Sequence, residues 1–151
     1  MGTEMTAFIE YDSTPDVWST SEPMPAPFSL ESGEPFSLTR NGGIYTGSKD
    51  NRFFAAIAGV NNETGIPPLI PPKGAPPNPS PEVLAALDYR KELADYGTGW
   101  LRLSEINAAL EHQRVDRNFL HFETQTILAI MGVLAQRLGD EWVRLVFGFD
   151  S

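Results

Sequence analysis

Runs of apolar and β-branched residues near both ends of the chain predict strands. Residues 6–11 (TAFIEY) precede turn-forming residues and are typical of a first strand. Apolar side chains alternate along 142–149, which predicts a last strand with one face in the core. That face would carry Val143, Leu145, Phe147 and Phe149. Between them, Asn41-Gly42-Gly43 can supply the positive φ of a tight turn, so we expect a hairpin over 36–46.

Two helices are predicted in the middle of the chain. Residues 51–58 are dense in apolar side chains, with Ser48 or Asp50 as a cap and Gly59 as a stop. Ser80-Pro81-Glu82 is typical of a helix start, because the hydroxyl caps and proline and an acid suit the first turn. We expect this second helix to run to about Tyr96 and to stop at Gly97.

Two further helices are predicted towards the C-terminus. An extended segment at 97–103 leads into Ser104-Glu105, which opens a helix through Leu110. The last helix runs from near Asp116 or Asn118 to Leu138 and carries two apolar stripes. A helix that is apolar on two faces either lies centrally against a sheet or packs against another subunit, so we expect a homo-oligomer. The second stripe consists of Phe119, Phe122, Ile130 and Val133.

Proline shapes the connection between the first two helices. Residues 61–79 carry three Pro-Pro pairs, which predicts a stiff, extended loop. A PxxP ligand for a recognition domain can be drawn there, but a loop wrapped over its own domain is the simpler interpretation. Together the elements predict one α+β domain over residues 1–151, with a small, mostly antiparallel sheet, four helices and a long proline-rich loop.

Composition narrows the classes of function. The chain has 151 residues, no cysteine and a formal charge of −9. Disulfides, thiolate nucleophiles and cysteine-rich metal sites are excluded, and the acidic charge argues against binding to duplex nucleic acid. Neither a signal peptide nor a membrane span is predicted, so we expect a cytoplasmic protein. The acidic surface could keep the protein soluble, which is the simpler interpretation, or meet a basic partner.

Candidate catalytic chemistry is sparse. His112 and His121 lie near several acids, so a metal or general-base site is conceivable. No HExxH, GxSxG, Walker or GxGxxG signature is present, which makes an enzyme the less favoured class and predicts no metal or cofactor. A structural interpretation places His112 at an exposed helix end and His121 at the edge of the core.

Cations and aromatic residues suggest a ligand site instead. Lys49 and Arg52 fall at the start of the first predicted helix, where backbone N–H groups also attract anions, and Lys73 could join them from the proline loop. Tyr96 and Trp100 flank Gly97-Thr98-Gly99 and could stack on a base, with Arg102 close by. The simpler alternatives are solvated cations offset by Asp50 and a Trp100 that anchors the core.

Several short motifs resemble an uncharacterised family of small proteins from bacteriophages and bacterial genomes. The matching segments are 49–60 (KDNRFFAAIAGV), 72–74 with 80–83 (PKG and SPEV), 99–106 (GWLRLSEI) and 144–150 (RLVFGFD). Relatives often carry histidines where this chain has Tyr96 and Thr98, so no histidine role is carried over. The resemblance implies a phage-associated protein that acts in the host cytosol, where such small proteins commonly counter host defence.

Three functional hypotheses follow. The first is a phage-type protein that sequesters a small anionic, nucleotide-derived immune signal, using Lys49, Arg52, Lys73, Tyr96, Trp100 and Arg102. The second is a direct inhibitor of a host defence protein, which it would bind through the acidic surface and the proline loop. The third is a hydrolase of a nucleotide signal that uses His112, His121 and nearby acids.

Overall fold

The structure, a computed structural model, describes residues 4–12, 19–20, 44–45, 50–81, 83–85 and 96–150. The side chains of Glu4, Ser19, Thr20, Ile44, Tyr45, Tyr96 and Asp150 are not described. Lys49, the turn of the expected hairpin and most of the second predicted helix lie outside the described residues.

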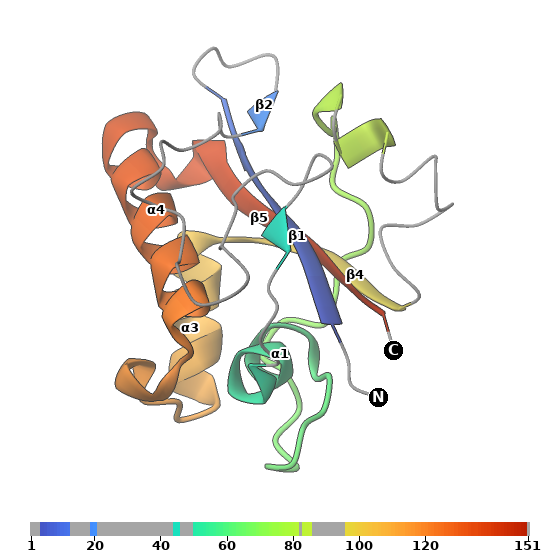
Figure 1. Ribbon diagram of the computed structural model, residues 1–151, viewed down its shortest axis with the longest axis vertical. Helices are drawn as coiled ribbons and strands as arrows, with labels where there is room; N and C mark the ends of the chain where they lie inside the picture. Colours follow the sequence, from blue (N-terminus) through green and yellow to red (C-terminus); the bar gives the residue numbers. More distant parts are fainter. Residues whose placement is uncertain are drawn as a thin grey trace, which may run out of the picture.

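An antiparallel sheet forms the centre of the molecule (Figure 1). Strand β1 (Glu4–Tyr11) pairs along its whole length with β5 (Val143–Asp150), and β5 pairs on its other side with β4 (Tyr96–Arg102). Two short strands, β2 (Ser19–Thr20) and β3 (Ile44–Tyr45), pair antiparallel with β1. The first and last strands are therefore neighbours at the centre of the sheet.

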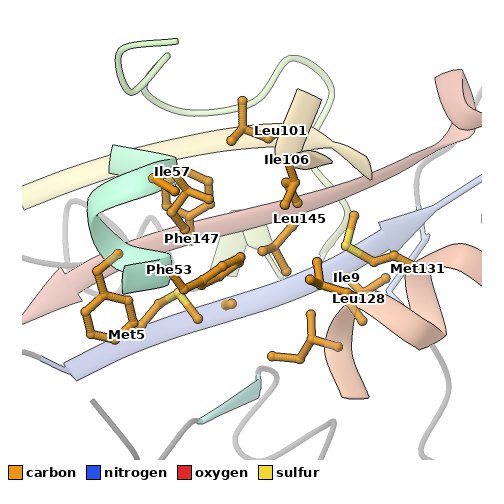
Figure 2. Packing of buried hydrophobic residues seen from close by; sticks show 14 of the residues in the cluster. Met5, Ile9, Phe53, Ile57, Leu101, Ile106, Leu128, Met131, Leu145 and Phe147 are labelled. Carbon is orange, nitrogen blue, oxygen red and sulfur yellow. The ribbon is translucent and has the colours of Figure 1, made fainter. Parts of the chain in front are cut away.

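Three helices pack with the sheet to form the main core: α1 (Asn51–Ala58), α3 (Leu103–His112) and α4 (Phe122–Leu138). Figure 2 shows their apolar side chains meeting those of the three long strands. The predicted core residues of the last strand, Val143, Leu145, Phe147 and Phe149, are each 0% exposed. These elements confirm the α+β class expected from the sequence.

The opposite sheet face holds a smaller core. Phe8 and Val146 pack there with Val83, and Trp100 lies half-buried against them. Val83 belongs to a helical stretch of which residues 81 and 83–85 are described. Ser80 precedes this stretch, and its carbonyl accepts a hydrogen bond from Leu84 N at 2.8 Å, as expected for the predicted helix start.

Two predicted boundaries are wrong. Tyr96 does not end a helix; it is the first residue of β4. The last helix begins at Phe122 instead of Asp116 or Asn118, because residues 117–119 form a separate 3-10 turn, η2 (Arg117–Phe119). Leu120 then adopts an extended conformation and is 4% exposed, so burial of its side chain breaks the helical path.

The other boundaries follow local signals. Helix α1 ends at Gly59, whose φ of +71° is the left-handed conformation expected of a helix stop. Residues 61–80, which include the predicted proline loop, contain neither helix nor strand. A second 3-10 turn, η3 (Asp140–Trp142), joins α4 to β5. Within the described part of the chain, no helix is long and apolar enough to cross a membrane.

Candidate functional site

Residues 61–80 are called the proline segment below. Lys73 of this segment lies against Trp100 of β4. Its Nζ is 3.8 Å from the centroid of the indole ring, a cation–π contact. The same ammonium group binds both carboxylate oxygens of Glu105, at 3.0 and 2.8 Å. The ion pair is accessible to solvent, since the two side chains are 26% and 24% exposed.

Backbone contacts hold the Lys73-Gly74 turn on the strand. Gly74 N donates a hydrogen bond of 2.9 Å to Thr98 O. A Cβ at Gly99 would lie 3.3 Å from Lys73 N, so the glycine permits the close approach of the two segments. The proximity of Lys73 to Trp100 therefore follows from the path of the backbone as well as from the side chains.

Two arginines complete this site, which we call the Trp100 cluster: Lys73, Trp100, Arg102, Glu105 and Arg144. Trp100 and Arg102 are two residues apart on β4, so their side chains lie on the same face of the sheet. Arg102 pairs in register with Arg144 of β5. The Arg144 guanidinium carbon is 5.6 Å from the Trp100 ring centroid. Glu105 also accepts a hydrogen bond of 3.0 Å from Arg102 N, which ties the start of α3 to the cluster.

The cluster is built on a buried ion pair between Glu10 of β1 and Arg144. Arg144 Nε donates to Glu10 Oε1 at 2.7 Å, and the side chains are 1% and 0% exposed. Arg144 Nη2 also donates to Pro77 O, and Glu10 Oε2 accepts from Ser80 N. Burial lowers the pKa of Arg144 from its ordinary value, and the Glu10 carboxylate opposes this change.

This ion pair is the part of the site that sequence reasoning missed. A charged residue inside an apolar strand is a signal, because Glu10 follows Phe8-Ile9 and Arg144 follows Trp142-Val143. The pair holds the end of the proline segment against the sheet. Among the residues that the structure describes, the charges near this site are three cations, Lys73, Arg102 and Arg144, and two carboxylates, Glu10 and Glu105.

The proline segment is also held at its beginning, by the last turn of α3. Gln113 is 4% exposed, donates to Ile66 O at 2.7 Å and accepts from Thr64 Oγ1 at 3.0 Å. His112 Nε2 lies 3.2 Å from Pro67 O. His112 is exposed at the helix end as expected, and its contact with this carbonyl is structural.

The predicted ligand residues divide into groups. Lys73, Trp100 and Arg102 lie together in the Trp100 cluster. Arg52 contacts Phe119 instead, with its guanidinium carbon 5.3 Å from the ring centroid. Tyr96 is described only as backbone, at the end of β4 remote from Arg102, and Lys49 lies outside the described residues.

A carboxylate of the chain itself lies where α1 begins. Asp50 is 2% exposed, and its Oδ2 accepts from His121 N at 2.8 Å and from Thr124 Oγ1 at 2.7 Å. Asp50 therefore links the start of α1 to the start of α4. His121 is exposed, which differs from its expected place at the edge of the core, and its backbone N–H binds Asp50.

Among the residues that the structure describes, no three histidines or carboxylates are placed to hold a metal ion. Comparisons with protein-family models, curated proteins and solved structures find no match to this chain. We therefore infer function from the geometry of the Trp100 cluster and from the short sequence motifs.

Proposed function

We propose that the protein is a non-catalytic binding protein that sequesters a small anionic ligand of nucleotide type at the Trp100 cluster. The observation that carries this proposal is the position of Lys73 Nζ, 3.8 Å from the Trp100 ring and within 3.0 Å of both Glu105 oxygens. A cation and an aromatic ring thus lie together at one solvent-accessible place.

Charge supports an anionic ligand. Among the described residues, three cations and two carboxylates lie around Trp100, whereas the whole chain carries −9. Lys73 is bound to Glu105 through an exposed ion pair, and such pairs contribute only about 0–1 kcal/mol. A phosphate group can replace Glu105 as the partner of Lys73, with Arg102 beside it, at small cost to the fold.

The indole supports a ligand with a planar base. Stacking of a base on an aromatic side chain contributes about 1–3 kcal/mol. When Lys73 moves from the ring to a phosphate group, it leaves the ring face open for such stacking. Glu10 and the two carbonyl partners of Arg144 hold that guanidinium in place, so the other side of the site stays formed.

The motif resemblance supports a biological setting. Small phage accessory proteins commonly counter host defence, and sequestration of a nucleotide immune signal requires affinity but no catalytic group. The hydrolase hypothesis gains no support from geometry, because His112 contacts Pro67 O and His121 is the N-cap residue that precedes α4. The direct-inhibitor hypothesis remains the alternative to ligand capture.

Calorimetric titration with cyclic dinucleotides and with cyclic ADP-ribose isomers tests the proposal. We expect saturable heat with one ligand class, and a loss of affinity of at least about tenfold in Lys73→Ala and Arg102→Ala. Arg137→Ala, which removes an exposed cation from the end of α4, is the matched control and should bind normally. The absence of heat with every ligand would refute capture, and a stoichiometric host protein retained on the immobilised chain would then favour direct inhibition.

A further inference from the structure

The proline segment crosses the outer edge of the sheet. Strand β4 lies at this edge, and Gly74 N donates a hydrogen bond to Thr98 O of the strand. Before the crossing, Ile70 packs against the main core. After it, Pro77 O accepts from Arg144, whose side chain lies on the opposite face of the sheet. The segment therefore wraps around β4 from one face of the sheet to the other.

Both ends of the proline segment are held by buried polar side chains. Near its beginning, Gln113 is buried and donates to Ile66 O at 2.7 Å. At its end, the buried Glu10 carboxylate accepts from Ser80 N at 2.6 Å. Release of either end would leave a buried polar group without its partner, which is costly. The two ends are therefore fixed points of the segment.

Residues 71–75, which we call the tip, are held much less firmly. The tip lies between Ile70, which packs on the core, and Pro76, which is buried. Its own residues are exposed, apart from the half-buried Gly74. Among the described residues, the polar contacts that hold it are the bond from Gly74 to β4 and the accessible Lys73–Glu105 ion pair. A short exposed segment with so few buried contacts can open locally at small cost.

The tip covers the indole of Trp100 through its lysine. Other neighbours of the ring are fixed, because Phe8 and Val146 belong to the smaller core and Arg144 is 1% exposed. Lys73 Nζ lies 3.8 Å from the ring centroid and belongs to the exposed tip. Movement of the tip away from β4 would therefore uncover the side of the indole on which Lys73 lies.

We propose that the tip is a lid on the ligand site and that the Lys73–Glu105 ion pair is its latch. This inference rests on the proposed function, since the lid would act on a ligand bound at the Trp100 cluster. When the latch opens, the tip moves away from β4, a planar base enters beside the indole, and the tip closes again with Lys73 on the phosphate group. A closed lid lowers the apparent affinity, because only the open form admits the ligand. The latch therefore regulates binding.

Hydrogen exchange followed by NMR tests the lid without any ligand. After correction for intrinsic rates, we expect Gly74 N–H to exchange at least about 100-fold faster than Ser80 N–H, because the tip opens by itself and the fixed end does not. Glu105→Gln should raise the rate at Gly74 about two- to fivefold, because the latch loses a charge. Glu111→Gln, at an exposed position of the same helix, is the matched control and should leave that rate unchanged. The rate at Ser80 should be the same in both variants.

Exchange in the presence of ligand tests what the lid acts on. The probe is the cyclic dinucleotide or cyclic ADP-ribose isomer that gives saturable heat, and at saturation it should slow exchange at Gly74 at least about tenfold, because the lid closes on it. Exchange at Gly74 that is as slow as at Ser80, insensitive to Glu105→Gln or unchanged by a bound probe would overturn the lid and leave the proposed function standing. The absence of heat with every probe would overturn both.

Discussion

The Glu10 carboxylate and the Arg144 guanidinium form an ion pair of 2.7 Å at the join between the first and last strands. Neither side chain is more than 1% exposed, so each charge depends on the other for compensation. Arg144 also donates to Pro77 O and Asn78 O, and Glu10 accepts from Ser80 N. The pair thus joins the sheet to the proline segment that carries Lys73.

Removal of one member of this pair should strongly destabilise the protein. We expect Glu10→Gln and Arg144→Met each to lower the free energy of unfolding by about 3–5 kcal/mol, because one buried charge loses its partner. The double variant should lose less than the sum of the two. Urea denaturation measures all three, and Arg137→Met, at an exposed position, should change stability by less than about 0.5 kcal/mol. A loss below about 1 kcal/mol in Glu10→Gln would contradict this account.

Asp50 should contribute more to stability than an exposed capping carboxylate. Asp50→Ala leaves His121 N and Thr124 Oγ1 without their buried acceptor, and we expect a loss of about 2–3 kcal/mol. The control is Asp116→Ala, which removes the exposed carboxylate that accepts from Asn118 N and should cost about 0.5–1 kcal/mol. Thermal and urea unfolding provide the comparison. Equal losses in the two variants would show that burial of Asp50 does not increase its contribution to stability.

Gly97 should tolerate a side chain less well than Gly65, although both have positive φ. Their φ angles are +69° and +74°, but a Cβ at Gly97 would lie 2.7 Å from Phe149 Cδ2, whereas the space around Gly65 is open within 4 Å. Gly65→Ala should cost about 1–2 kcal/mol for backbone strain alone. Gly97→Ala should cost a further 1–3 kcal/mol or so from overpacking, measured by urea denaturation. Similar losses would mean that Phe149 moves freely aside.

Two variants of the Lys73–Glu105 pair should change ligand affinity in opposite directions. Lys73→Met removes the cation and should weaken binding at least about tenfold, while stability changes by less than about 1 kcal/mol. Glu105→Gln keeps an acceptor for Arg102 N but removes a competing charge, and should strengthen binding about fivefold. Calorimetry with the ligand identified by titration measures both affinities. A change of the same sign in both variants would indicate that the pair is structural only.

Local signals in the sequence were sufficient for several elements. The alternation at 142–149 predicts β5 and its buried face, because the period of two in a strand is a property of the backbone. Gly59 predicts the end of α1 for a similarly local reason. The start of α4 was not predictable in this way, since burial of Leu120 and the bond from His121 N to Asp50 set it, and Asp50 lies 71 residues away.

In the candidate site, too, some features were predictable from the sequence and others depend on the fold. Lys73, Trp100 and Arg102 were identified one by one from their chemistry, but their contact depends on the turn at Gly74 bonding to Thr98. Arg52 has the same chemistry and lies instead on Phe119. Residue type therefore identifies candidates for binding an anion, whereas only the path of the chain determines which of them meet.

By itself, the sequence determined the class of fold, the buried face of its last strand and the acidic charge, because these depend on residue type and on spacing along the chain. The tertiary structure alone decided that Glu10 pairs with Arg144, 134 residues away. It also decided that Phe119, Phe122 and Val133 of the second predicted stripe stay exposed, whereas Ile130 of the same stripe is buried. Both results depend on which surfaces the folded chain brings together and which it leaves uncovered. Which distant segments meet is a property of the whole fold, so no local pattern specifies it.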